Sequence, residues 1–231
     1  MKVFLNHIAC EGFTQATGIE TLPLKGYERL AEPVSAHADM LINIIEENIF
    51  CYEDHYCRNK KVFAIAESLG YNVIKCKPPI SSAYPYDVGL NALVIGKRIF
   101  GKADYLSNEL KSLAAERGYE LINVNQGYSA CTTLVLNEKN VVTGDVSIKK
   151  ALEKNGINVT LIKEDNIKLP GYNMGFIGGA SFVLKDKIYT FGDAKKLSSY
   201  SDISREAQRL NMEIISISSG DVFDFGGAKS I

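Results

Sequence analysis

Three side chains in this sequence have the chemistry of a nucleophile and its helpers: Cys131, His37 and Asp39. A thiol near its reference pKa is mostly protonated at neutral pH, so it needs a neighbouring base or cation before it attacks a substrate. A histidine titrates close to physiological pH and both accepts and donates protons. His37 and Asp39 lie two apart at the head of a predicted strand, which would put both side chains on one face. We interpret all three as candidate catalytic residues.

Each of the three also has an ordinary structural interpretation. His37 could bond a neighbour at the end of a strand, with Asp39 capping a loop. Most free cysteines are small buried hydrophobic residues, and Cys131 fits that description as well. The other thiols are weaker candidates for chemistry: two lie in apolar runs, one leads a predicted helix, and one follows His7 in an unassigned segment (Cys51, Cys76, Cys57 and Cys10).

A second group of polar residues lies at the heads of the other predicted strands. Asp87 and Asn91 begin one of these strands, where they could hold a cationic ligand beside Asp39 or merely satisfy the strand end. Thr133 and Lys229 head two more strands. We expect Asp87, Asn91, Thr133 and Lys229 to be the substrate-binding residues if the protein has a ligand.

Other polar and glycine residues are interpreted structurally. Asp104, Asp145 and Asp193 each precede a predicted helix, and this recurrence favours N-capping over chemistry. The glycine pairs that begin at Gly178 and Gly226 lack the strand-turn-helix context of a phosphate-binding loop. They are predicted to allow close approach of the backbone instead.

A repeated unit of strand, strand, helix and strand positions these residues. In residues 128–162, two β-branched runs flank a polar turn at 137–140, apolar residues then recur at helical spacing, and Gly156 marks the helix end. The same order is predicted in three other segments, at about 33–80, 84–127 and 173–218.

Alignment of the four first strands gives each unit an equivalent residue. Asp39, Asn91, Thr133 and Ser181 are predicted to share one position. In the same alignment, Cys131 takes the position of His37 in its own unit. We therefore expect the thiol and the imidazole to face one central channel.

A fifth unit is predicted to combine both ends of the chain. Residues 225–231 mirror 177–183, which puts Lys229 at the shared position, but no partner strand follows. A lone strand would leave backbone groups unpaired. Short strands at 2–6 and 21–24, with a helical turn between them at 11–17, are predicted to supply the missing parts. The sequence predicts one α/β domain over 1–231, with 219–231 and 1–30 joined as its last unit.

Composition narrows the class of protein. The 231 residues carry a formal net charge of −1, which argues against a nucleic-acid partner. No apolar run reaches the roughly 18 residues of a membrane span. Five cysteines without a Cys-x-x-Cys pair favour reduced thiols over disulfides or zinc. We expect a cytoplasmic location, no membrane association, and no metal, nucleotide or flavin cofactor.

These features together resemble the pentein fold of guanidino-group-modifying enzymes, which include arginine and agmatine deiminases, dimethylarginine hydrolases and amidinotransferases. The resemblance covers nearly the whole chain and is carried by the repeat, by the His37 and Asp39 pair, and by the strand after Gly226. Residues 126–129 and 175–180 also resemble a bacterial branch of this fold. It implies a five-bladed ββαβ propeller with pseudo-five-fold symmetry, closed by pairing the two ends of the chain.

The resemblance implies a division of labour among the candidates. In such enzymes a cysteine attacks the guanidinium carbon, a histidine moves protons, and carboxylates grip the guanidinium nitrogens. Here Cys131, His37 and Asp39, with Asp87, would take those roles. The sequence departs from the pattern at its last strand, where the hydrolytic members carry their cysteine and this chain has Ser230 near that place.

We expect a protein that binds a small guanidine- or amide-bearing ligand in its central channel, and that acts on it as a cysteine-dependent hydrolase or amidinotransferase if it is catalytic. The alternative is a non-catalytic relative. It would be a ligand sensor, or an assembly factor comparable to translation initiation factor six, the ribosome-binding member of the fold.

Overall fold

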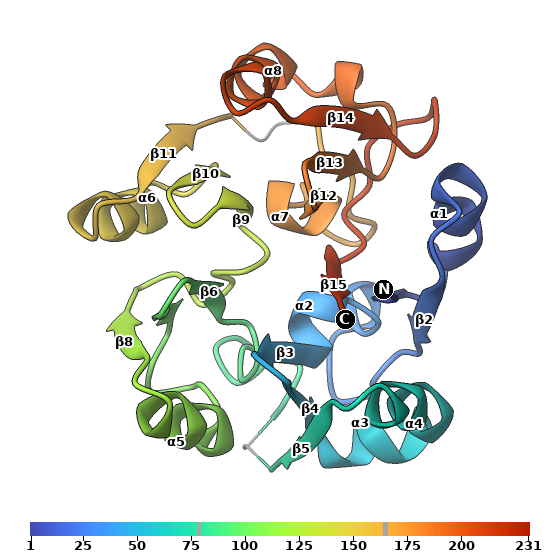
Figure 1. Cartoon of the computed structure of the whole chain (residues 1–231), viewed down its shortest axis with the longest axis vertical. Helices are drawn as coiled ribbons and strands as arrows, with labels where there is room; N and C mark the ends of the chain where they lie inside the picture. The colour runs from blue at the N-terminus through green and yellow to red at the C-terminus, as the bar shows by residue number, and fades with distance from the viewer. Residues whose placement is uncertain (78–79, 164–165) are drawn as a thin grey trace.

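Five three-stranded sheets make up the framework of the described residues, which are 1–77, 80–163 and 166–231 of a computed structural model. Figure 1 shows the five sheets arranged around a common centre, with most of the helices toward the outside. None of the described helices is long and apolar enough to cross a membrane.

Four of the sheets share one topology. The first strand is antiparallel to the second, and the second is parallel to the third. A parallel pair cannot be joined by a tight turn, so a helix makes each crossover. The first strands are β3 (Ile42–Ile45), β6 (Leu93–Ile95), β9 (Thr133–Asn137) and β12 (Ser181–Leu184). The second strands are β4 (Asn48–Tyr52), β7 (Arg98–Gly101), β10 (Asn140–Thr143) and β13 (Lys187–Thr190). The third strands are β5 (Asn72–Cys76), β8 (Glu120–Asn123), β11 (Asn158–Leu161) and β14 (Glu213–Ser216).

The crossover helices bury one apolar face against the sheets. They are α3 (Glu53–Arg58) with α4 (Lys60–Ser68), α5 (Asn108–Glu116), α6 (Val146–Lys154), and α8 (Tyr200–Arg209) preceded by the 3₁₀ turn η2 (Ala194–Lys196). In α5, α6 and α8 the buried residues recur four apart, as the sequence pattern predicts: Leu110 and Ala114, Ile148 and Leu152, and Ile203 and Ala207.

The fifth sheet joins the two ends of the chain. β1 (Val3–Asn6) lies between β15 (Ala228–Ser230), its antiparallel neighbour, and β2 (Thr21–Leu24), its parallel neighbour. Helix α1 (Cys10–Thr17) makes the crossover, and the 3₁₀ turn η1 (Glu32–Val34) leads to the next sheet. Lys2 and Ile231 exchange backbone hydrogen bonds of 2.7 and 2.8 Å. The predicted pairing of the chain ends is confirmed.

Two short helices differ from the predicted strands. α2 (Ala38–Leu41) and α7 (Ile177–Ala180) lie near the centre of Figure 1, directly before β3 and β12. His37 is the N-cap residue of α2 and Asp39 lies inside it. Residues two apart in a helix do not share a face, so the prediction that a strand aligns these two side chains is wrong.

The predicted equivalence of four residues is also wrong in part. Thr133 and Ser181 are the first residues of β9 and β12. Asp39, however, lies three residues before β3, and Asn91 two residues before β6. Cys131 precedes its strand by two residues and His37 by five, so they do not hold one position in the unit.

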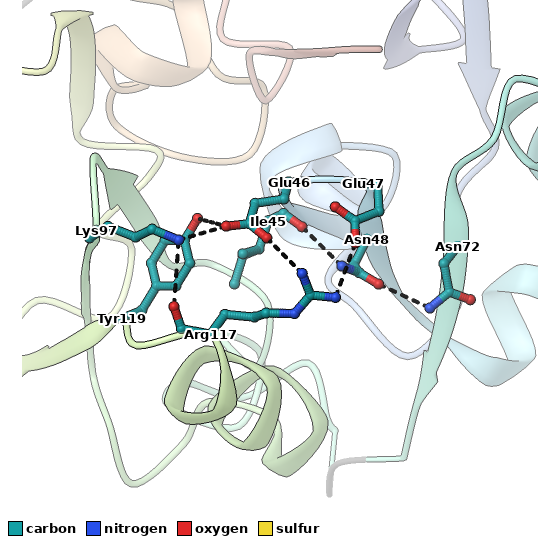
Figure 2. Close-up of polar contacts among 8 residues, drawn as sticks. All are labelled: Ile45, Glu46, Glu47, Asn48, Asn72, Lys97, Arg117 and Tyr119. Atoms are coloured by element: carbon teal, nitrogen blue, oxygen red, sulfur yellow. Dashed lines mark hydrogen bonds and ion pairs between the residues drawn. The ribbon is translucent and has the colours of Figure 1, made fainter.

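Polar contacts at the β3–β4 turn link neighbouring sheets (Figure 2). Glu46 binds Lys97, from the β6–β7 turn, at 2.6 Å and Arg117, from the end of α5, at 3.2 Å. Glu47 binds the same guanidinium at 3.1 Å. Tyr119 contributes a phenol hydroxyl 3.4 Å from Glu46. These exposed pairs link the β3–β4 turn to the next strand-helix unit along the chain.

Candidate functional site

The Cys131 thiol is buried in the turn before β9, and Asn91 holds that turn in place. The Asn91 amide nitrogen lies 2.9 Å from Sγ of Cys131 and 3.1 Å from the carbonyl oxygen of Asp39. Its amide oxygen accepts the backbone N–H of Ala130 at 2.9 Å. Met40 Sδ lies 3.9 Å from Sγ. Asn91, which lies just before β6, therefore holds the Cys131 thiol in position.

His37 lies beside Asp224, an acid that sequence reasoning missed. The two side chains approach to 3.6 Å between Nδ1 and Oδ1, an electrostatic contact rather than a short hydrogen bond. Asp224 is itself fixed, because its oxygens accept the backbone N–H groups of Phe176 and Gly226, each at 2.9 Å. Asp224 lies two residues before the glycine pair that begins at Gly226, and this proximity is the feature of the sequence that could have identified it.

Glycines allow this His37–Asp224 contact. Gly226 has a φ of +78°, and a Cβ there would lie 2.2 Å from Cβ of His37. A Cβ at Gly179 would lie 2.0 Å from Oδ1 of Asp224. No larger residue fits either position without displacing the pair. The prediction that these glycines permit close backbone approach is confirmed.

The candidate residues line two cavities. The first, which we call the thiol cavity, has a volume of about 110 Å³ and is lined by His37, Cys131 and Asp224 with apolar and aromatic side chains that include Tyr128 and Phe176. The second, the lysine cavity, has a volume of about 240 Å³. Its polar lining residues are Asp39, Asn43, Thr133, Ser181 and Lys229. Thus Cys131 and His37 line one cavity and Asp39 lines the other, while the Asp39 carboxylate also lies beside the Cys131 thiol.

Charges near Cys131 keep it a thiol in the free protein. Burial raises its pKa well above the ordinary value, and the negative charges of Asp39 and Asp224 raise it further. The hydrogen bond from Asn91 acts in the opposite direction but does not outweigh them. Burial also raises the pKa of Asp224, although the nearby His37 lowers it.

Lys229, on β15, is the cationic side chain that lines the lysine cavity. Burial lowers the pKa of its ammonium group, while the charge of Asp39 raises it, as a thiolate at Cys131 would. This direction means that loss of water outweighs attraction to the neighbouring acid.

Asp87 was predicted to bind a ligand, but the structure gives it a supporting position. It lines neither cavity. Its Oδ2 accepts the Tyr128 hydroxyl at 2.6 Å, so it positions a wall of the thiol cavity. Among the residues that the structure describes, no cluster of three or more His, Cys, Asp and Glu side chains forms a metal site.

Comparison with known proteins gives a family and a fold. Residues 9–228 match the model of a family of unknown function, DUF6873. No curated protein matches the sequence.

Several solved structures that resemble this chain are guanidino-modifying enzymes. DDAH from Pseudomonas aeruginosa, complexed with citrulline, has 10% identity and a TM-score of 0.58 over 94% of this chain and 92% of its own. An amidinotransferase of saxitoxin biosynthesis from Microseira wollei has 11% identity and a TM-score of 0.59, over 94% and 76%. Agmatine deiminase from C. jejuni has 9% identity and a TM-score of 0.53, over 93% and 75%. The predicted pentein fold is confirmed.

Proposed function

Because this chain belongs to the family of unknown function DUF6873, we propose its function from its own site: a cysteine-dependent hydrolase or amidinotransferase that acts on a small guanidine- or amide-bearing substrate. The observation that carries the proposal is that Cys131 and His37 line one small cavity with Asp224 beside the imidazole. We further propose that the five sheets form one closed five-bladed ring around these cavities.

In the proposed reaction, Cys131 Sγ forms a bond with the guanidine or amide carbon, and His37 takes the thiol proton. Asp224 faces Nδ1 of His37, which leaves Nε2 for this transfer. The C–N bond then breaks, and the proton on His37 leaves with the amine. Water in a hydrolase, or an acceptor amine in an amidinotransferase, releases the product from sulfur and returns a proton to the thiol.

The substrate helps to ionise the thiol in this scheme. Asp39 and Asp224 oppose a thiolate in the free protein. A guanidinium cation in the thiol cavity would offset their charges and lower the pKa of Cys131. The rings of Tyr128 and Phe176, which line that cavity, are surfaces on which a cation is stabilised.

Turnover with defined variants tests this function. The protein is incubated with a panel of guanidines, ureas and primary amides, and the amine released is measured. Cys131→Ser is expected to abolish turnover and His37→Gln to reduce it by about 100-fold or more. Cys57→Ser, at an exposed cysteine, is the matched control and should be fully active. Turnover that survives Cys131→Ser would contradict the proposal.

A non-catalytic function is the second candidate, because the buried, protonated thiol of Cys131 is a poor nucleophile without a partner. A ligand sensor of this kind, or an assembly factor, would show no turnover of any compound. A sensor would still be stabilised against heat by its ligand. Thermal shift without turnover, unchanged in Cys131→Ser, would favour the sensor.

A further inference from the structure

The lysine cavity lies at the heads of several first strands, and its Asp39 and Lys229 neighbour the Cys131 thiol. Thr133 begins β9, Ser181 begins β12 and Lys229 is in β15. Asp39 comes from α2. Neither Cys131 nor His37 lines this cavity. It therefore has its own set of polar lining groups, although Asp39 also contacts the thiol that lines the other cavity.

Acceptor atoms without donors line this cavity. Neither carboxylate oxygen of Asp39 has an N–H or O–H donor among the described residues, and its neighbour Cys131 offers only a weak S–H donor. Oδ1 of Asn43 and Oγ1 of Thr133 have no hydrogen-bond partner among these residues either. All three side chains are buried. The Asn43 amide cannot simply turn over, because its nitrogen donates to the carbonyl oxygens of Leu90 and Ala92 at 3.0 and 2.8 Å. Buried acceptors of this kind need N–H or O–H donors.

Lys229 supplies a donor and a positive charge to the same cavity. Asp39 attracts it electrostatically, but within the part of the chain that the structure describes no ion pair joins the two side chains. The ammonium therefore has hydrogen atoms to offer to an oxygen of a ligand. One carboxylate and one ammonium leave the cavity without net charge.

Unpaired acceptors beside one carboxylate and one ammonium favour an uncharged ligand over a cationic one. A guanidinium group has only donors and carries a positive charge, so it would satisfy Asp39 but repel Lys229. A carboxamide or ureido group has N–H donors beside a carbonyl acceptor and no charge. We propose that the lysine cavity is a second small-molecule site that binds a carboxamide or ureido group, with its N–H groups on Asp39 and Asn43 and its oxygen on Lys229.

Two isosteric probes test the assignment. L-citrulline and L-arginine share a skeleton and differ in whether the terminal group is ureido or guanidinium. Calorimetric titration up to about 10 mM should show citrulline binding at least about tenfold tighter than arginine. Lys229→Met keeps the length of the side chain and removes its charge. This variant should bind citrulline more weakly and arginine more tightly, so that the ratio of the two affinities falls or reverses.

Variants in the two cavities locate the site. Thr133→Val removes a hydroxyl from the lysine cavity and should weaken citrulline severalfold. If Lys229→Met does not fold, the citrulline affinity of Thr133→Val tests the inference in its place. Tyr172→Ala removes an exposed side chain from the thiol cavity and should leave citrulline affinity unchanged.

Several outcomes overturn the inference: no citrulline binding, equal or tighter binding of arginine that Tyr172→Ala leaves unchanged and that the thiol cavity therefore does not explain, or a preference for citrulline that folded Lys229→Met leaves intact. The proposed catalytic function is contradicted by a different result, turnover that survives Cys131→Ser. Citrulline binding is measured in Cys131→Ser as well, where it should equal that of the unchanged protein.

Discussion

His55 is a buried histidine with one clear hydrogen bond. Its Nε2 lies 3.0 Å from the carbonyl oxygen of Lys25, and its ring packs against Tyr27 and Phe63. Burial lowers its pKa to about 4, because water is absent to solvate an imidazolium. The folded protein therefore keeps His55 neutral where the unfolded chain protonates it.

This histidine should make the protein acid-sensitive. Between pH 6.5 and about 4 the unfolded chain binds a proton at this residue that the folded protein does not. The free energy of unfolding should then fall by up to about 3 kcal/mol as the pH drops through this range. Urea denaturation at several pH values measures the slope. His55→Gln should flatten it, and an unchanged slope would assign the acid sensitivity to other groups.

Site residues were only partly predictable from the sequence. Cys131 and His37 do share a cavity, but the strand alignment that suggested this is wrong. Asp224 escaped notice because its partner, His37, is far away in the chain. The fold joins them when β15 pairs with β1 and the Gly226 carbonyl accepts the N–H of Asp39 at 3.1 Å.

At the scale of elements, helix α6 has a well-made N-terminus. Asp145 accepts the backbone N–H groups of Ser147 and Ile148 at 2.7 and 2.8 Å, and its other oxygen accepts the Gln126 side chain at 2.8 Å. The predicted cap is confirmed here. At α5, Ser107 and not Asp104 is the cap, with its hydroxyl accepting the N–H of Leu110.

The two aspartates make a matched pair for a test of capping. Asp145→Ala should lower the free energy of unfolding by about 1 kcal/mol, since it leaves helix N–H groups without an acceptor. Asp104→Ala should change it by less than about 0.5 kcal/mol. Chemical denaturation of both variants gives the comparison. Equal losses would mean that these bonds do not stabilise α6.

Sequence periodicity identified the long crossover helices but failed for shorter or more crowded elements. α2 and α7 each have four residues, about one turn, so neither shows a repeating apolar pattern. In α4 the apolar Ile65 is 37% exposed, and Leu69, the C-cap residue, is 50% exposed. Phe63 takes the buried face instead, because its ring packs on Phe4 at 5.9 Å.

At the scale of the whole molecule, β15 completes a sheet that begins at the other end of the chain. β1 is bonded on both sides, by β15 and by β2. The glutamates and cations of Figure 2 link two other sheets through exposed ion pairs, which water screens and which therefore contribute little to stability. The terminal pairing involves backbone hydrogen bonds to the buried strand β1 and should matter more.

Removal of residues 228–231 tests the importance of this pairing. The deletion takes away the β1–β15 ladder and the two Lys2–Ile231 bonds, each worth about 1 kcal/mol, and uncovers one edge of β1. We expect the free energy of unfolding to fall by more than about 3 kcal/mol in urea denaturation. Ser230→Ala, at an exposed position on β15, should lie within about 0.5 kcal/mol of the unchanged protein.

The terminal pairing also sets the order of events during synthesis. A ribosome makes β1 well before β15, so one edge of β1 has no native neighbour until β15 has emerged. An unpaired apolar edge is a template for strands of other nascent chains. Chaperones that shield the emerging N-terminal segment should therefore raise the yield of this protein more than those that act after release.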